Sequence, residues 1–228
     1  MNSKLTGYFQ LTRPINLSLG AISIFIGAFI TGTIQPFTKV LLACISGSLV
    51  MAGGNVINDY FDVDIDRLNK PWRPLSSNTV KVQDAVIFSI ILFVLGIFLS
   101  IFIHSAAFVV VVLTSLGLIL YSAKLKRTVL LGNLAVSLFS AMAFVYGALS
   151  VGRWRESLIP ASFAFLFHLG REIIKDVEDR KADEACAAHT LPVRFGQKPA
   201  FVAATCVFVI LIIFTFIPYL FGIYGKGY

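Results

Sequence analysis

The chain has 228 residues, of which 57% are hydrophobic and only 14% charged, and it carries a formal net charge of +7. Soluble domains have roughly 25% charged residues, so this composition leaves too little polar side chain to cover a soluble globule and excludes a disordered chain. We therefore expect an integral membrane protein. The excess of lysine and arginine is then explained by the orientation of the chain in the membrane, and we expect no nucleic-acid partner.

Apolar runs that are long enough to cross a bilayer as helices occur seven times. They lie near residues 15–33, 40–60, 85–103, 106–121, 130–151, 158–174 and 200–221. No small-residue cleavage site closes the first run, so it is interpreted as a retained helix and not as a signal peptide. The sequence therefore predicts an all-α fold, a polytopic transmembrane helix bundle that forms a single domain over residues 1–228.

The basic residues are distributed unevenly among the segments that connect these runs. Most of the 19 lysines and arginines fall before the first run and in the second, fourth and sixth connections. By the positive-inside rule, these segments and the N-terminus lie on the cytoplasmic side of the cell membrane. Of the 12 acidic residues, only Glu156 is expected on the other side.

The second apolar run ends in the acidic sequence NDYFDVDIDR, residues 58–67. If the helix continues through it, Asp59, Asp62 and Asp66 stand at i, i+3 and i+7. These positions fall within roughly 60° of arc on one helix face, whereas Asp64 points elsewhere. We call Asn58, Asp59, Asp62 and Asp66 the first Asp motif.

The sixth run ends in a second acidic sequence with the same spacing. Asp176, Asp179 and Asp183, which we call the second Asp motif, again stand at i, i+3 and i+7, and Glu172 extends the stripe one turn back. Stacked carboxylates repel one another unless a cation compensates them. Mg²⁺ does this with oxygen ligands that it shares between carboxylates and substrate phosphates. A single acidic cluster could also be a solvated loop of mixed charge. Two clusters with identical spacing, each at the end of an apolar run, favour a magnesium–diphosphate site.

The two motifs also belong to a longer repeat. Each is followed by a basic, proline-containing segment, with Pro71 and Pro74 after the first and Pro192 after the second. We expect two pseudo-twofold-related halves, roughly residues 11–128 and 129–228, because parallel repeats occur in membrane bundles. The fourth connection adds Lys124, which could bind phosphate oxygens that the metals do not reach.

The first Asp motif resembles the signature of the UbiA superfamily of intramembrane prenyltransferases, and the resemblance covers about residues 11–221. Further segments are similar to this family: the opening Arg13-Pro14-x-Asn16, Arg73-Pro74-Leu75, the loop that begins at Tyr121, Asp179 with Asp183, and Thr190-Leu191-Pro192 with Gly196.

The resemblance implies an enzyme that transfers an isoprenyl group from its diphosphate, with Mg²⁺ as cofactor. It implies metal ligands at Asn58, Asp59, Asp62, Asp66, Asp176, Asp179 and Asp183. Substrate-binding residues would be Arg13, Asn16, Asn58, Arg67, Arg73, Lys124 and Arg171. The catalytic group would comprise Asp62, Asp66, Asp179, Asp183, Lys124 and Tyr121.

Members of this family have nine transmembrane helices, so we expect two C-terminal helices beyond the seven runs of this sequence. The short N-terminus and compact loops look most like digeranylgeranylglyceryl phosphate synthases. This resemblance implies geranylgeranyl diphosphate as donor, geranylgeranylglyceryl phosphate as lipophilic acceptor, membrane lipid as surroundings and phospholipid biosynthesis as role.

Two alternatives stay open. Within the family, the acceptor could be aromatic, of the 4-hydroxybenzoate or naphthoate type used in quinone synthesis. Outside it, two acidic helix ends could serve a divalent-cation transporter. Transporters place their coupling carboxylates near the bilayer midplane, whereas these acids lie at helix ends and lead directly into basic loops.

Overall fold

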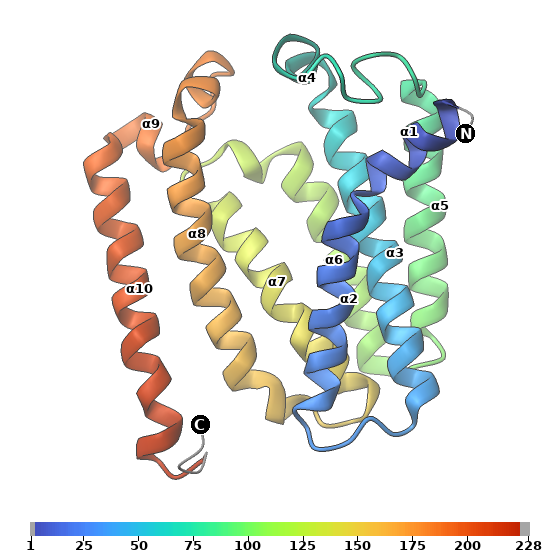
Figure 1. Ribbon diagram of the computed structural model, residues 1–228, viewed down its shortest axis with the longest axis vertical. Helices are drawn as coiled ribbons and strands as arrows, with labels where there is room; N and C mark the ends of the chain where they lie inside the picture. The colour runs from blue at the N-terminus through green and yellow to red at the C-terminus, as the bar shows by residue number, and fades with distance from the viewer. Residues whose placement is uncertain (1–2, 224–228) are drawn as a thin grey trace. The chain divides into compact units, whose positions relative to one another are not determined.

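The computed structural model describes residues 3–223, which form helices joined by turns and contain no strand (Figure 1). The long helices are α2 (Pro14–Phe29), α3 (Phe37–Phe61), α5 (Val82–Ser100), α6 (Ser105–Ala123), α7 (Leu131–Ser150), α8 (Leu158–Ala185) and α10 (Gln197–Leu220). The short ones are α1 (Ser3–Thr12), α4 (Val63–Asn69), η1 (Leu125–Arg127), η2 (Trp154–Ser157) and α9 (Leu191–Phe195).

The predicted membrane fold is confirmed. Within residues 3–223, seven helical segments are long and apolar enough to cross a membrane, and each overlaps one of the seven apolar runs. The main difference concerns α8, which continues well past residue 174 and carries the second Asp motif within the same helix. The two C-terminal helices expected from the family would lie outside the described residues.

The chain forms two compact units. The first comprises Met1–Ala123 with Ala143–Ser157, and the second comprises Lys124–Met142 with Leu158–Tyr228. Helix α7 contributes its first part to the second unit and its last part to the first. Each Asp motif therefore belongs to one unit, the first to unit 1 and the second to unit 2.

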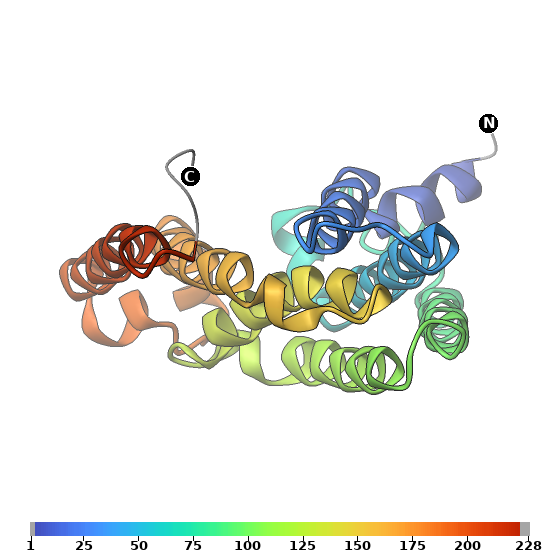
Figure 2. The same ribbon diagram turned by 90° about the horizontal axis from the view of Figure 1, so that it is seen from below.

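Helix α3 is the central helix of unit 1. It contacts α1, α2, α5 and α6, and the two views of the ribbon show α2 and α5 beside it (Figures 1 and 2). Buried apolar side chains from these helices, among them Ile24, Val50, Phe93 and Val111, form its core. The first Asp motif thus begins on the best-supported helix of the unit.

Helices α3 and α5 approach each other closely through serine and glycine residues. The Ser46 hydroxyl of α3 donates to the Gly96 carbonyl of α5 over 2.7 Å, and the Ser89 hydroxyl of α5 donates to the Gly53 carbonyl of α3 over 2.9 Å. A Cβ at Gly96 would collide with the side chain of Val50. Such small-residue contacts with hydrogen bonds are typical of helix pairs in membranes.

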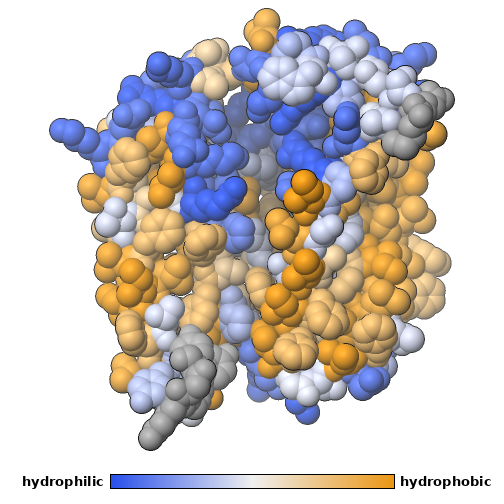
Figure 3. All heavy atoms as spheres, in the orientation of Figure 1, coloured by the Kyte–Doolittle hydropathy of each residue, from blue (hydrophilic) through white to orange (hydrophobic). Residues whose placement is uncertain are grey.

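Unit 2 is built on the pair α8 and α10, with α9 packed against both. Its core includes Ile173, Val177 and Leu191. Figure 3 shows hydrophobic residues over the length of α10 and hydrophilic residues gathered near the end of α8 that carries the second Asp motif. This apolar outer surface is what a lipid-facing helix requires.

Candidate active site

The first Asp motif spans the junction between α3 and α4. Helix α3 ends at Phe61, and Asp62 lies between the two helices with backbone angles φ −98° and ψ 0°. The helix does not continue without interruption through the motif, contrary to what the spacing argument had assumed. The winding nevertheless continues, because the Asp62 amide donates to the Asn58 carbonyl and the Asp66 amide to the Asp62 carbonyl. Asp59 and Asp66 consequently stay on one face.

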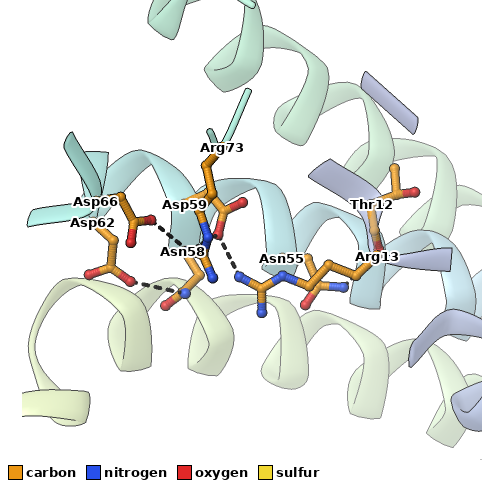
Figure 4. A network of polar contacts seen from close by, with 8 residues as sticks. All are labelled: Thr12, Arg13, Asn55, Asn58, Asp59, Asp62, Asp66 and Arg73. Carbon is orange, nitrogen blue, oxygen red and sulfur yellow. Dashed lines mark hydrogen bonds and ion pairs between the residues drawn. The ribbon is translucent and has the colours of Figure 1, made fainter. Parts of the chain in front are cut away.

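Two arginines neutralise this face (Figure 4). Arg73 Nη1 donates to Asp66 Oδ2 over 2.6 Å and to Asp59 Oδ1 over 3.2 Å. Arg13 Nη2 donates to the same Oδ1 atom of Asp59. Both aspartates are buried, each with 5% of its surface exposed. Burying two carboxylates together is tolerable because charged donors reach both of them.

Asp62 has different surroundings. It is partly exposed, and its Oδ2 atom accepts a hydrogen bond from the neutral Asn58 side-chain amide over 3.2 Å. Asn58 stands one turn earlier, at the end of α3, so the pair presents amide and carboxylate groups at the junction. Oxygen ligands of this kind are the ones that Mg²⁺ prefers.

Arg13 reaches Asp59 because the backbone turns sharply between α1 and α2. Arg13 has a left-handed φ of 55°, and Pro14 begins α2 directly after it. A bulky residue rarely adopts this conformation, whereas proline is favoured at a first helical position. The Asn55 side chain secures the turn from α3 by donating to the Thr12 carbonyl over 2.9 Å.

The second Asp motif lies on one face of the last turns of α8, and neutral donors hold it in place. The Asn133 side chain of α7 donates to Asp176 Oδ2 over 2.8 Å. The Thr190 hydroxyl donates to Asp183 Oδ2 over 3.0 Å. Asp179, between them on the same helix, is exposed. Both of these donors are neutral, in contrast to the arginines that bind Asp59 and Asp66.

Upstream on α8, the buried carboxylate of Glu172 orients two cations. Its Oε1 atom accepts from Arg171 Nη1 over 2.6 Å, and its Oε2 atom lies 3.6 Å from Lys175 Nζ. Both cations line a groove of about 510 Å³ between α8 and α10. The remaining lining residues are Phe167, Ile174, Glu178, Asp179 and Phe208.

Four other predicted site residues lie in or directly after α2, α4 and α6. Arg67 pairs with the exposed Asp64 over 3.1 Å. Asn16 is exposed on α2, and Tyr121 is partly exposed near the end of α6. Lys124 is exposed directly after α6. Among residues 3–223, no hydrogen bond joins Arg67, Asn16 or Lys124 to an Asp motif.

Mg²⁺ suits the chemistry of these residues. Within residues 3–223, no three His, Cys, Asp or Glu side chains gather closely enough to hold a metal ion by themselves. Mg²⁺ usually binds through one or two protein carboxylates and completes its shell with phosphate oxygens and water. Asp62 with Asn58, and Asp179 with Asp183, fit that requirement.

Two residues of this site were not predicted from the sequence as site residues, namely Asn133 and Thr190. Asn133 is a single amide within an apolar run, and a polar residue in such a position usually faces a partner inside the bundle. Thr190 belongs to the segment Thr190-Leu191-Pro192 that resembles the family, but the partner of its hydroxyl group depends on how the chain turns after α8.

The helical membrane fold and the two carboxylate motifs at helix ends define a membrane-embedded prenyltransferase. The chain belongs to the UbiA prenyltransferase family, whose sequence pattern matches residues 20–228. Family membership sets aside the divalent-cation transporter.

Among curated relatives, the chain is 43% identical to digeranylgeranylglyceryl phosphate synthase of Sulfurisphaera tokodaii, over 94% of this chain and 79% of that protein. It is 37% identical to the synthase of the same name from Methanopyrus kandleri, over 98% and 82%. A solved structure of a digeranylgeranylglyceryl phosphate synthase in membranes is 36% identical, with a TM-score of 0.85 over 97% of this chain and 80% of that chain. The fold also matches a UbiA homolog from Archaeoglobus fulgidus bound to DMAPP and Mg²⁺, at 21% identity and a TM-score of 0.76 over 96% of this chain and 79% of that chain.

Proposed function

We propose that this enzyme transfers a geranylgeranyl group from geranylgeranyl diphosphate to geranylgeranylglyceryl phosphate, in the synthesis of archaeal-type ether lipids. The observation that carries the proposal is the 43% identity to a digeranylgeranylglyceryl phosphate synthase over 94% of the chain. Both curated relatives reported above are named digeranylgeranylglyceryl phosphate synthase, and the Asp motifs supply the carboxylates that a diphosphate enzyme needs.

The proposed reaction exchanges one carbon–oxygen bond for another. The bond between C1 of the isoprenyl group and the diphosphate breaks, and the diphosphate leaves with the bonding electrons. The acceptor hydroxyl oxygen bonds to C1 and loses its proton. Mg²⁺, when bound, would neutralise the leaving diphosphate.

The residues of the chain have separate roles in this proposal. Asn58 and Asp62 would supply oxygens to one metal ion, and Asp179 and Asp183 to another. Asp66 could join the first ion if Arg73 moves from its carboxylate to a phosphate oxygen. Asp176, which Asn133 holds, would support the second ion through its neighbours.

Further cations of the chain would contact substrate. Lys124, Arg67 and Arg171 are basic and exposed, so their side chains could reach phosphate oxygens. Tyr121 and Asn16 would lie toward the reacting end of the site. The apolar helices would keep water from the allylic carbon once the bond to diphosphate breaks.

We further propose that the N-terminus and both Asp motifs face the cytoplasm, as the distribution of basic residues favours.

The internal repeat is part of the same proposal. Support comes from the matching order within each unit, in which a long apolar helix carries an Asp motif and leads into a short, proline-containing segment. In unit 1 this is α3 followed by Pro71 and Pro74, and in unit 2 it is α8 followed by Pro192.

Product analysis tests the acceptor. The purified protein, in liposomes with Mg²⁺ and radiolabelled geranylgeranyl diphosphate, receives either geranylgeranylglyceryl phosphate or 4-hydroxybenzoate. Label should move into the glyceryl ether and not into the aromatic acid. Transfer to 4-hydroxybenzoate alone would instead establish the aromatic alternative, and transfer to neither would refute both acceptors.

A further inference from the structure

The Oδ1 atom of Asp59 is a meeting point for two arginines from distant parts of the chain. It accepts a hydrogen bond from Nη2 of Arg13, which lies between α1 and α2, and one from Nη1 of Arg73, which lies in the segment after α4 (Figure 4). Because both nitrogens bind one oxygen, the two guanidinium groups are held next to each other. Without a carboxylate between them, they would repel each other.

The burial of the three side chains differs in a way that favours an external ligand. The Asp59 side chain is 7% exposed, whereas the side chains of Arg13 and Arg73 are 32% and 25% exposed. The carboxylate therefore lies beneath the two guanidinium groups. Within residues 3–223, the side-chain hydrogen bonds of these arginines start from one terminal nitrogen each, Nη2 of Arg13 and Nη1 of Arg73. Their other N–H groups can serve a ligand.

The same geometry argues against Asp59 as a metal ligand. Its Oδ1 atom already accepts two charge-assisted hydrogen bonds, and a divalent cation placed there would meet two guanidinium groups at close range. Asp62 differs, because it is partly exposed at the junction between α3 and α4, where a cation can reach its carboxylate. The roles within the first Asp motif are therefore divided between these two aspartates.

We propose that Asp59 is a positioning residue, which holds Arg13 and Arg73 together as a paired phosphate clamp and does not itself bind the metal. This rests on the proposed function, since the ligand of the clamp is the diphosphate of the isoprenyl donor. Guanidinium groups suit phosphate oxygens because their planar N–H donors can bind two oxygens at once. The left-handed backbone at Arg13 aims this side chain toward the carboxylate.

The first test separates phosphate binding from metal binding. In Asp59→Asn, the KM for geranylgeranyl diphosphate and the inhibition constant of inorganic pyrophosphate should both rise about 10- to 100-fold, the size of a lost charged hydrogen bond, whereas kcat changes little. Mn²⁺ binding without substrate, followed by electron paramagnetic resonance, should stay as in the wild type. Asp62→Asn should weaken Mn²⁺ binding. The matched control is Asp84→Asn, which alters an aspartate that pairs with Lys4 outside the proposed site and should change neither constant.

The second test is a double-mutant cycle with Arg73→Lys, measured as pyrophosphate inhibition. If Asp59 acts through the arginine, Asp59→Asn together with Arg73→Lys should be no weaker than the worse single variant. Effects that multiply would overturn the proposal, as would a loss of Mn²⁺ binding in Asp59→Asn equal to that in Asp62→Asn. If Asp59→Asn does not fold, the milder Asp59→Glu takes its place in the cycle. The double variant Arg13→Lys with Arg73→Lys then gives the pyrophosphate inhibition constant for a protein in which both arginines are altered.

The two proposals can fail separately. If the wild-type protein transfers no isoprenyl group to any acceptor, the proposed function is wrong. If the wild-type protein is active but the pyrophosphate inhibition constant does not change in Asp59→Asn, the function stands and the positioning role is wrong.

Discussion

The side-chain amide of Asn133 donates a hydrogen bond of 2.8 Å to the carboxylate of Asp176 and so joins α7 to α8 within unit 2. Asn133 is buried, with 5% of its surface exposed. Its partner is the first carboxylate of the second Asp motif. The contact therefore links the stability of the unit to the geometry of the site.

Removal of this amide should destabilise the protein. In Asn133→Ala, the partly buried Asp176 carboxylate loses its donor, which costs about 1–3 kcal/mol. For a chain of this size, each kcal/mol lowers Tm by about 2–4 °C. Thermal unfolding in detergent measures the shift. Asn69→Ala changes an exposed asparagine of α4 and should leave Tm unchanged; equal Tm values for both variants would contradict the prediction.

The hydroxyl of Thr190 should matter for catalysis through Asp183. In Thr190→Val, the 3.0 Å hydrogen bond to Asp183 Oδ2 is lost while the side-chain volume is kept. Because groups that orient a metal-binding carboxylate typically contribute 10- to 100-fold, kcat/KM should fall by about that factor. Thr190→Ser keeps the hydroxyl and should retain most activity. A valine variant as active as the serine variant would show that this contact does not orient the carboxylate.

Asp62 and Asp64 should behave differently although they are two residues apart. Asp62→Ala removes the proposed metal ligand at the helix junction and should lower kcat by about 100-fold or more, the usual effect of losing one electrostatic stabiliser of the transition state. Asp64→Ala removes only an exposed partner of Arg67 and should retain near wild-type kcat. The measurement is the initial rate of label transfer. Similar losses in both variants would argue against a special role of Asp62.

Chelation provides a test without any substitution. Treatment with EDTA should abolish isoprenyl transfer, and added Mg²⁺ or Mn²⁺ should restore it, because the leaving diphosphate and the Asp carboxylates are both negative. Undiminished transfer in EDTA would refute the metal requirement. Binding of inorganic pyrophosphate, measured in parallel, should also weaken when the metal is removed.

The membrane helices could be predicted from the sequence, because apolar runs of bilayer length leave little choice of structure. The i, i+3, i+7 spacing also placed Asp59 and Asp66 on one face, and their common partner Arg73 confirms this. The break at Asp62 was not predicted, since helix propensity alone does not locate it.

The partners of the carboxylates could not be predicted from spacing. Arg13 and Asp59 are far apart in the sequence, and so are Asn133 and Asp176, so their pairing depends on how the helices pack. The left-handed backbone at Arg13 could not be predicted either, because arginine has no preference for that conformation.

The reciprocal serine–glycine hydrogen bonds between α3 and α5 have a mechanical consequence. Ser46 and Gly53 lie two turns apart on α3, and Ser89 and Gly96 lie two turns apart on α5, so the helices are fastened at two levels about 10 Å apart. Neither helix can slide or rotate against the other without breaking both bonds. The position of Asn58 and Asp59 along the axis of α5 is thereby fixed, and any adjustment to substrate falls to the segments beyond Phe61.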